Sequence, residues 1–257
     1  MYKSHFTSVI IPALNEEQAI GKVIRSLQAL QNDDKSRIID QIIVCDNGST
    51  DRTSSIAKEE GAEVVYQSSP GYGIACLTAM KKLASKSDIV LFIDGDDCCY
   101  PQQGLALLED IHQGFDLAIG SRVLGHIEAN ALTSVQRFGN ALSSLLISWL
   151  WKKKVTDLGP FRAIRRSSLQ AINMQDKTFG WTIEMQIKCI QHGFTSSEQA
   201  VDSKQRIGVS KISGTIKGSI GAGIGILSMI AKLWLRQFKE RRHLVLVKSN
   251  VIDKKFD

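Results

Sequence analysis

The chain has 257 residues, of which 43% are hydrophobic and 23% charged, with 20 glycines and 4 prolines. This composition excludes a disordered, collagen-like or coiled-coil protein, and the length is enough for one large α/β domain with a sizeable core. Residues 1–201 hold 20 basic and 22 acidic side chains, whereas residues 202–257 hold 12 and 4, so the net charge of +6 comes from the C-terminal end. A basic end suits nucleic acid, an anionic membrane surface or a phosphate-bearing substrate. The 7% of aromatic residues are not interleaved with the basic ones, which argues against nucleic acid.

The cysteines and the long apolar runs indicate the compartment. The 5 cysteines show no metal-ligand spacing, and an odd number without a secretory leader indicates free thiols in a reducing compartment. We interpret the adjacent Cys98 and Cys99 as packing residues. Two uncharged runs, Phe138–Trp151 and Gly218–Ala231, fall short of the ~20 apolar residues that cross a bilayer. We therefore expect a cytoplasmic protein that lies on the membrane without crossing it.

Short apolar runs alternate with segments of helical spacing through the first 120 residues. Strands are expected at Ser8–Ile11, Gln41–Cys45, Glu63–Tyr66, Ile89–Ile93 and Leu117–Ile119, and helices at Glu16–Leu30, Ser54–Glu60, Ala75–Ala84 and Leu105–His112. Continuous Val and Ile runs are typical of parallel strands covered on both faces. The alternation predicts an α/β fold with a mostly parallel, doubly wound sheet flanked by helices, whose ligands bind beyond the C-terminal strand ends.

The pattern changes after Gly120 to longer helices around short extended pieces. Helices are expected at Val135–Trp151, Thr182–Gln191 and Ile216–Lys239, and extended pieces near Phe161–Ile164 and Ser197–Val201. We predict a catalytic domain over residues 1–215, in which an acceptor-side half packs on a nucleotide-side half. An amphipathic helix and a basic tail follow over residues 216–257.

Acidic side chains follow three of the predicted strands. Asp94-Gly95-Asp96-Asp97 comes after the most hydrophobic one, and carboxylates this close repel each other unless a cation lies among them. A divalent cation that carries nucleotide phosphates would meet that need, and a solvated acidic turn is the alternative. Asp46 follows a second strand, where a carboxylate can bind a ribose hydroxyl or a base N–H. The loop Pro12–Glu17 follows the first strand in the same way.

Three segments together resemble family 2 glycosyltransferases of the GT-A fold: Val9–Glu17, Val44–Thr53 and Asp94-Gly95-Asp96. Further segments resemble the dolichyl/polyprenyl-phosphate mannosyl- or glucosyltransferase branch of that family. They are Gly120-Ser121-Arg122, Asp157–Ala163 and Arg206–Lys211. The resemblance covers about residues 7–215.

The resemblance implies a metal-dependent, inverting transfer of a hexose from a UDP- or GDP-sugar to a polyprenyl phosphate. By position, the nucleotide-sugar site would consist of Pro12, Leu14, Glu16, Asp46 and Asp94, and Asp94 and Asp96 would hold Mg²⁺ or Mn²⁺. Two residues depart from the family pattern. Asn47 replaces the second Asp of the usual Asp-Asp-Gly-Ser motif. Gly71-Tyr72-Gly73 stands where Gly-Lys-Gly is common, so that Tyr72 replaces the lysine. These departures leave the choice between UDP and GDP open.

The kind of acceptor decides which catalytic groups are needed. A hydroxyl acceptor needs a general base, for which Asp157 and Glu184 are the candidates. A phosphate acceptor is already an anion and needs cations that hold it in line. The candidate cations are Arg122, Arg137, Arg206 and Lys211, and the resemblance implies that Arg122 and Arg137 contact lipid phosphate. A solvated or ion-paired side chain is the alternative for each arginine. The catalytic candidates are Asp96, Asp157, Arg122, Arg206 and Glu184, although the resemblance also allows Glu184 to orient an arginine.

The segment Ile216–Lys239 has an uncharged apolar centre with basic residues around it. Trp234 and Phe238 lie beside its basic end, which is typical of helices that lie in a membrane interface. A core helix with a solvated basic end is an equal alternative, and a Gly-rich contact in a homo-oligomer is another. We expect a peripheral protein at the cytoplasmic face of a membrane, and the need for a membrane-protein partner stays open.

Two other functions stay open from the sequence. One is the same enzyme with a saccharide, glycerol-phosphate or protein hydroxyl as acceptor. The other is a catalytically silent scaffold on the membrane surface, and the acidic loops argue against it because a scaffold does not need three carboxylates together.

Overall fold

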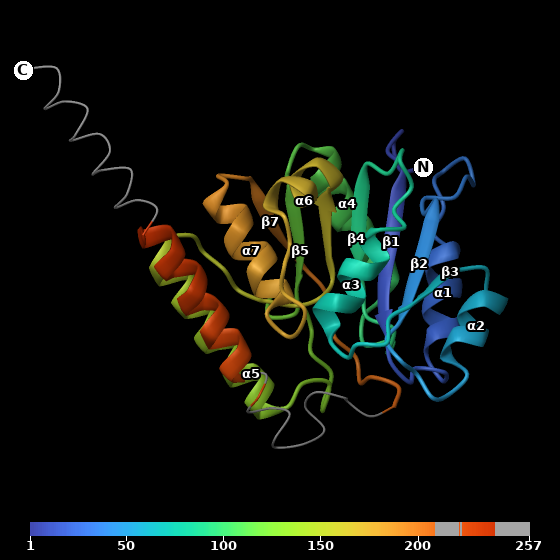
Figure 1. The fold of residues 1–257 in the computed structure, drawn as a ribbon. Helices are drawn as coiled ribbons and strands as arrows, with labels where there is room; N and C mark the ends of the chain where they lie inside the picture. The colour runs from blue at the N-terminus through green and yellow to red at the C-terminus, as the bar shows by residue number, and fades with distance from the viewer. Residues whose placement is uncertain (209–220, 222, 240–257) are drawn as a thin grey trace, which may run out of the picture.

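The strands form one seven-stranded sheet in the order β3-β2-β1-β4-β6-β5-β7 (Figure 1). The computed structural model describes residues 1–208, 221 and 223–239. The strands are β1 (Thr7–Ala13), β2 (Gln41–Asp46), β3 (Glu63–Tyr66), β4 (Ile89–Phe92), β5 (Leu117–Ser121), β6 (Arg162–Arg165) and β7 (Ser196–Ala200). β6 runs antiparallel to its neighbours β4 and β5, and the other pairs are parallel. The predicted mostly parallel sheet is confirmed.

Helices cover both faces of this sheet, except that α5 packs on α7 instead of on the sheet. They are α1 (Ile20–Gln28), α2 (Thr53–Glu59), α3 (Tyr72–Met80), α4 (Gly104–His112), α5 (Ser134–Trp151), α6 (Arg166–Ile172) and α7 (Trp181–Gln191), with a 3-10 turn η1 at Pro101–Gln103. Alternate residues of β1 serve opposite faces, because side chains alternate along a strand. Val9 and Ile11 pack in the cluster that contains α1 and α4, whereas Ile10 packs in the cluster that contains α3, α6 and α7.

Three helices differ from the sequence expectation. α3 spans Tyr72–Met80 rather than the expected Ala75–Ala84. α1 begins at Ile20 rather than at Glu16, because residues 16–19 form a turn in which the Glu16 carbonyl accepts from the N–H groups of Ala19 and Ile20. α6 was not predicted. It begins at Arg166, directly after the last residue of β6, so no Gly, Pro or polar turn in the sequence separates the two elements.

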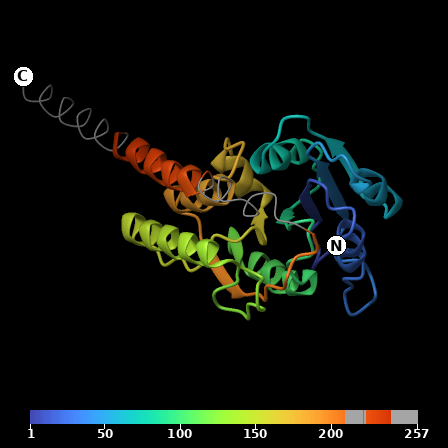
Figure 2. The same ribbon diagram turned by 90° about the horizontal axis from the view of Figure 1, so that it is seen from below.

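A third core cluster joins α5 and α7 to the C-terminal helix (residues 223–239), which lies beside α5 (Figures 1 and 2). Met229, Ile230 and Leu233 of the C-terminal helix are buried in the same cluster as Ile147 of α5 and Ile187 of α7. One face of the C-terminal helix is therefore part of the core. Among the described residues, no helix is long and apolar enough to cross a membrane.

Candidate active site

Loops that follow β1, β2, β4 and β5 meet at one edge of the sheet, because the carboxyl ends of parallel strands share an edge. The first two of these loops are hydrogen-bonded to each other. Asn15 N donates to Ser49 Oγ (2.9 Å), and Asn15 Oδ1 accepts from Thr50 N (2.8 Å). Glu16 N donates to Thr53 Oγ1 (2.8 Å). The predicted nucleotide residues Pro12, Leu14 and Glu16 therefore lie in and after β1, next to the loop after β2.

Asp46 and Asn47 both fasten main-chain segments of this edge. The buried Asp46 carboxylate accepts from Ser49 N (2.8 Å) and from the Ser54 hydroxyl. Asn47 Nδ2 donates to the carbonyls of Gln67 (3.0 Å) and Ser69 (2.6 Å), and Asn47 Oδ1 accepts from Gly71 N (2.8 Å). An aspartate has no amide hydrogens for two carbonyls. Asn47, which departs from the family motif, therefore fixes the segment that leads to Tyr72.

The start of α3 lies against the loop between α6 and α7. Gly73 N donates to Thr178 O (3.1 Å), and Ile74 N donates to Lys177 O (2.9 Å). A Cβ added at Gly73 would lie 2.2 Å from Asp176 O, so only glycine permits this approach. Glu184 positions the same loop. Its carboxylate accepts from Asp176 N (2.7 Å) and Gln175 N (3.0 Å) and pairs with Lys188 (2.7 Å).

Gly73→Ala is expected to lower the free energy of unfolding by about 1–3 kcal/mol, because the added methyl group overlaps the Asp176 carbonyl. Thermal unfolding followed by circular dichroism measures the change. The matched control is Gly139→Ala in α5, where no atom lies within 4 Å of the new Cβ and alanine favours the helix. Equal stability of Gly73→Ala and the native chain would contradict the packing described here.

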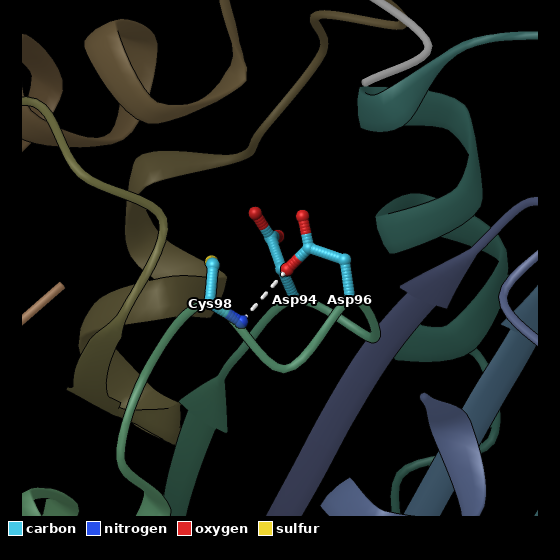
Figure 3. A group of neighbouring side chains, drawn as sticks. All are labelled: Asp94, Asp96 and Cys98. Carbon is cyan, nitrogen blue, oxygen red and sulfur yellow. Dashed lines mark hydrogen bonds between the residues drawn. The ribbon is translucent and has the colours of Figure 1, made fainter. Parts of the chain in front are cut away.

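Asp94, Asp96 and Cys98 project to the same side of the loop after β4 (Figure 3). Their ligand atoms all lie within 4.8 Å of one another. Asp96 Oδ1 accepts from Cys98 N (3.2 Å), Asp96 Oδ2 pairs with Arg206 Nη1 (2.9 Å), and Asp94 Oδ1 accepts from the Tyr72 hydroxyl (3.0 Å). Two carboxylates side by side form a donor set that suits a hard divalent cation.

The protonation of this group favours oxygen ligands. A hydrogen bond to Cys99, together with burial, raises the pKa of the Cys98 thiol well above its usual value, so the thiol stays protonated. Burial and the neighbouring Asp96 raise the pKa of Asp94 to about 7. The positive charge of a bound cation lowers the pKa of a neighbouring carboxyl and favours its ionised form, which is the form that binds the cation. Cys98, interpreted from sequence as a packing residue, lies within this group.

Asp97 is turned away from this pair toward two lysines. Its buried carboxylate pairs with Lys22 Nζ (2.7 Å) and Lys204 Nζ (2.7 Å). The sequence suggested that three carboxylates share one cation. The structure restricts that argument to Asp94 and Asp96, because the side chains of two lysines already neutralise Asp97.

Tyr72→Phe is expected to raise the Mn²⁺ concentration for half-maximal activity roughly three- to tenfold at pH 7, because a hydrogen bond to a charged group is lost. The Tyr72 bond lowers the pKa of Asp94, so its loss moves that pKa further above 7 and makes protons compete with the cation. The difference should shrink as the pH rises past the new pKa. Tyr100→Phe, which removes a hydroxyl bonded to Glu128, is the control. The same Mn²⁺ requirement in both variants at pH 7 would contradict this role of Tyr72.

Arg122 and Asp157 form a bidentate ion pair beyond the end of β5, in which Asp157 is buried and Arg122 is half-buried. Arg122 Nε donates to Asp157 Oδ2 (2.8 Å), and Arg122 Nη2 donates to Asp157 Oδ1 (2.7 Å). Burial alone would raise the pKa of Asp157, but the hydrogen bonds and charge of Arg122 hold it below its usual value. Main-chain N–H groups of Arg122 and Leu158 also donate to this carboxylate. Asp157 is thus ionised with both oxygens engaged, an arrangement that suits positioning of Arg122 better than proton transfer.

A cavity of about 300 Å³ opens beside this ion pair, between the end of β5 and α5. Arg122 and Arg137 both line it, so the structure brings together these two predicted phosphate-binding arginines. The rest of the lining is largely apolar: Val123, Ile127, Leu132 and Ala141, with Asn140 and Thr156. Arg206 does not line this cavity and forms an ion pair with Asp96. The predicted Lys211 lies outside the described residues.

Comparison with known proteins shows the family of this chain. Residues 8–172 match the family described as glycosyl transferase family 2. A dolichyl-phosphate hexose transferase of Haloferax volcanii is 32% identical over 207 residues, 80% of this chain and 86% of that protein. An uncharacterized glycosyltransferase of Mycobacterium tuberculosis is 29% identical over 225 residues, 87% of this chain and 97% of that protein. The chain therefore belongs to glycosyl transferase family 2 and is a glycosyltransferase.

A solved structure shares the fold. The crystal structure of glucosyl-3-phosphoglycerate synthase from Mycobacterium tuberculosis, in complex with Mn²⁺, UDP and glucosyl-3-phosphoglycerate, has a TM-score of 0.70 to this chain. The match covers 90% of this chain and 80% of that chain at 21% sequence identity. The likeness supports the GT-A type of fold with its mixed central sheet.

Proposed function

We propose that this chain transfers a hexose, with inversion, from a UDP- or GDP-sugar to the phosphate of a polyprenyl lipid of the dolichyl type. The observation that carries the proposal is the cavity beside β5 and α5. Its arginines, Arg122 and Arg137, supply charge for a phosphate, and its apolar lining suits the hydrocarbon next to that phosphate. The dolichyl-phosphate hexose transferase among the relatives supports the same acceptor.

On the donor side, we assign Pro12, Leu14, Glu16 and Asp46 to the nucleotide-sugar site and Asp94 and Asp96 to a divalent cation, Mg²⁺ or Mn²⁺. The cation would neutralise the leaving diphosphate. Support comes from the position of all these residues at one sheet edge and from the oxygen-rich pair at Asp94 and Asp96. The Mn²⁺ and UDP in the solved synthase support the same class of donor.

On the acceptor side, a phosphate is already an anion, so its attack requires no general base. This fits the engagement of Asp157 with Arg122 and of Glu184 with the loop before α7. Asp157 and Glu184 then act as positioning residues. Arg122, Arg137, Arg206 and Lys211 are the proposed phosphate-binding cations.

A small phosphate-bearing hydroxyl acceptor is the second candidate, because the solved synthase was crystallised with glucosyl-3-phosphoglycerate. That acceptor would need a base to remove its hydroxyl proton. It would also leave the apolar part of the cavity unfilled. The lipid phosphate is therefore the better fit to these residues.

We also propose a catalytic domain over residues 1–215 and an interfacial segment over residues 216–257, at the cytoplasmic face of a membrane. Of this second range, residues 216–220, 222 and 240–257 lie outside the described part of the chain. α5 exposes Val135, Phe138, Leu145 and Trp149, and the neighbouring C-terminal helix exposes Ile224, Leu227, Trp234, Leu235 and Phe238. Exposed apolar side chains on adjacent helices are typical of membrane-binding surfaces.

Replacement of Phe138 and Trp149 by serine is expected to weaken flotation with anionic vesicles by roughly tenfold or more, because both large side chains are exposed. Tyr66→Ser, at the β3 edge of the sheet and far from α5, is the control (Figure 1). If vesicle binding is unchanged in the double variant, these side chains do not bind the membrane. They would then belong to a contact with a second copy of the chain or with another protein, which size-exclusion chromatography would detect.

The test of the reaction uses the purified protein, Mn²⁺ or Mg²⁺, a panel of labelled UDP- and GDP-sugars, and polyprenyl phosphate or 3-phosphoglycerate. The proposal expects label in the organic phase from one donor, only when polyprenyl phosphate is present. Label in a water-soluble product with 3-phosphoglycerate, and none in lipid, would favour the second candidate. The same panel would decide between UDP and GDP.

A further inference from the structure

The segment after β7, residues 203–207, runs beside the loop after β4 that carries Asp94, Asp96 and Asp97. Lys204 N donates to Cys98 O (3.0 Å), and Ile207 N donates to Asp96 O (3.0 Å). Ser203 pairs with Cys99 in an isolated antiparallel bridge. Because these main-chain contacts fix the segment, the side chains of Lys204 and Arg206 are brought to the carboxylates of the loop.

The two cations of this segment take different carboxylates. Lys204 pairs with Asp97, which also has Lys22. Arg206 pairs with Asp96, one of the two residues assigned to the divalent cation. Among the residues that the structure describes, Arg206 is the one positively charged side chain that forms an ion pair with either carboxylate, and the pair is with Asp96. Arg206 therefore lies where the proposed cation has to bind.

A guanidinium and a divalent cation on one carboxylate repel each other. Asp96 Oδ2 is taken by Arg206, and Asp96 Oδ1 already accepts from Cys98 N. The Arg206 side chain is 28% exposed, so water screens its ion pair and the contact is easily exchanged. Arginine also binds phosphate well, because its planar group can donate two parallel hydrogen bonds. A displaced Arg206 would thus have a ready partner in a phosphate-bearing substrate.

We propose that Arg206 is a stand-in for the divalent cation. It neutralises Asp96 before the cation binds, and binding of the cation releases its guanidinium to a phosphate of the substrate. This inference rests on the proposed function, since it uses the cation site and a phosphate-bearing substrate. It gives the reaction an order, in which the cation binds before the phosphate contact of Arg206 forms.

The test is a titration of the full chain with Mn²⁺ alone, in which electron paramagnetic resonance measures free Mn²⁺. Arg206→Met is expected to bind Mn²⁺ roughly two- to fivefold more tightly than the native chain, because a competing cation is gone. The same variant should need a higher polyprenyl phosphate concentration for half-maximal transfer. An ordinary contributor to the metal site would give the opposite result, a weaker affinity for Mn²⁺.

Two further variants are the controls. Arg206→Lys keeps the charge and is expected to bind Mn²⁺ as the native chain does. Lys204→Met removes a charge from the same segment, but Asp97 keeps Lys22, so its gain should be smaller than that of Arg206→Met. Unchanged or weaker Mn²⁺ binding by Arg206→Met, or an equal gain in any control, would overturn the proposal. The titration uses neither donor nor acceptor, so its failure is distinguishable from failure of the proposed reaction.

Discussion

Asp96→Asn is expected to reduce hexose transfer about a thousandfold, because the loss of a cation that neutralises a leaving diphosphate removes several kcal/mol of transition-state stabilisation. Asp96 is buried and lies beside Asp94, the other carboxylate of the proposed cation site. An amide of the same shape keeps an oxygen that can accept from Cys98 N but loses the charge. The measurements are the transfer rate at saturating donor and the affinity for Mn²⁺, and both are expected to fall.

Asp97→Asn is the matched control for this prediction. It removes the same charge one residue further on, from a carboxylate that pairs with Lys22 and Lys204 instead of facing Asp94. We expect it to lower stability and to leave Mn²⁺ binding within a few-fold of the native value. Full activity in Asp96→Asn would reject the cation assignment. Equal losses of Mn²⁺ binding in both variants would show that general negative charge, and not two specific ligands, attracts the cation.

Arg122→Ala is expected to lower the free energy of unfolding by about 3 kcal/mol as well as to impair use of the acceptor. The reason is the Asp157 carboxylate, which is 0% exposed and would be left buried without the partner that neutralises its charge. For a chain of this size, the melting temperature should fall by about 6–12 °C. The family resemblance implies only a contact between Arg122 and lipid phosphate, and the effect on stability follows from the ion pair with Asp157.

The effect of Arg122→Ala on stability should depend on pH. Arg122 depresses the pKa of Asp157 in the folded chain, so the pair contributes its full stability above the ordinary Asp pKa of about 3.9. That contribution is lost as the pH falls through the lower, folded pKa, and the native chain and the variant should converge there. Arg137 is an exposed residue that lines the same cavity. Its replacement by alanine is expected to change the free energy of unfolding by no more than about 0.5 kcal/mol. A melting temperature for Arg122→Ala equal to that of Arg137→Ala would contradict the buried pair.

The sheet could be predicted because local pattern and topology agree. Continuous apolar runs such as Ile89–Phe92 are buried on both faces, which is what parallel strands between two helical layers require. The antiparallel direction of β6 had no such local signal, since a four-residue run looks the same in either direction. The start of α3 at Tyr72 depends on carbonyls of residues 177 and 178, far away in the chain.

The candidate site could be predicted by residue type and only partly by contact. The motifs predicted that Asp94 and Asp96 act as a pair and that Arg122 and Arg137 share one phosphate. In the structure the two aspartates are neighbours and the two arginines line one cavity. The partners that tune these groups come from distant segments: Tyr72 on Asp94, Arg206 on Asp96, and Lys22 and Lys204 on Asp97. A lone tyrosine or lysine carries no sequence signal for such a contact, because the signal lies in the folded geometry.

The packing of the C-terminal helix has a consequence for where this polypeptide can be shortened. Met229, Ile230 and Leu233 cover Ile147, Ile183 and Ile187, side chains that belong to two other helices. A chain that ends at residue 215 would expose those isoleucines to water, and the exposed apolar surface would favour association with other molecules. Such a truncated chain is expected to aggregate on expression even with every residue of the nucleotide side intact.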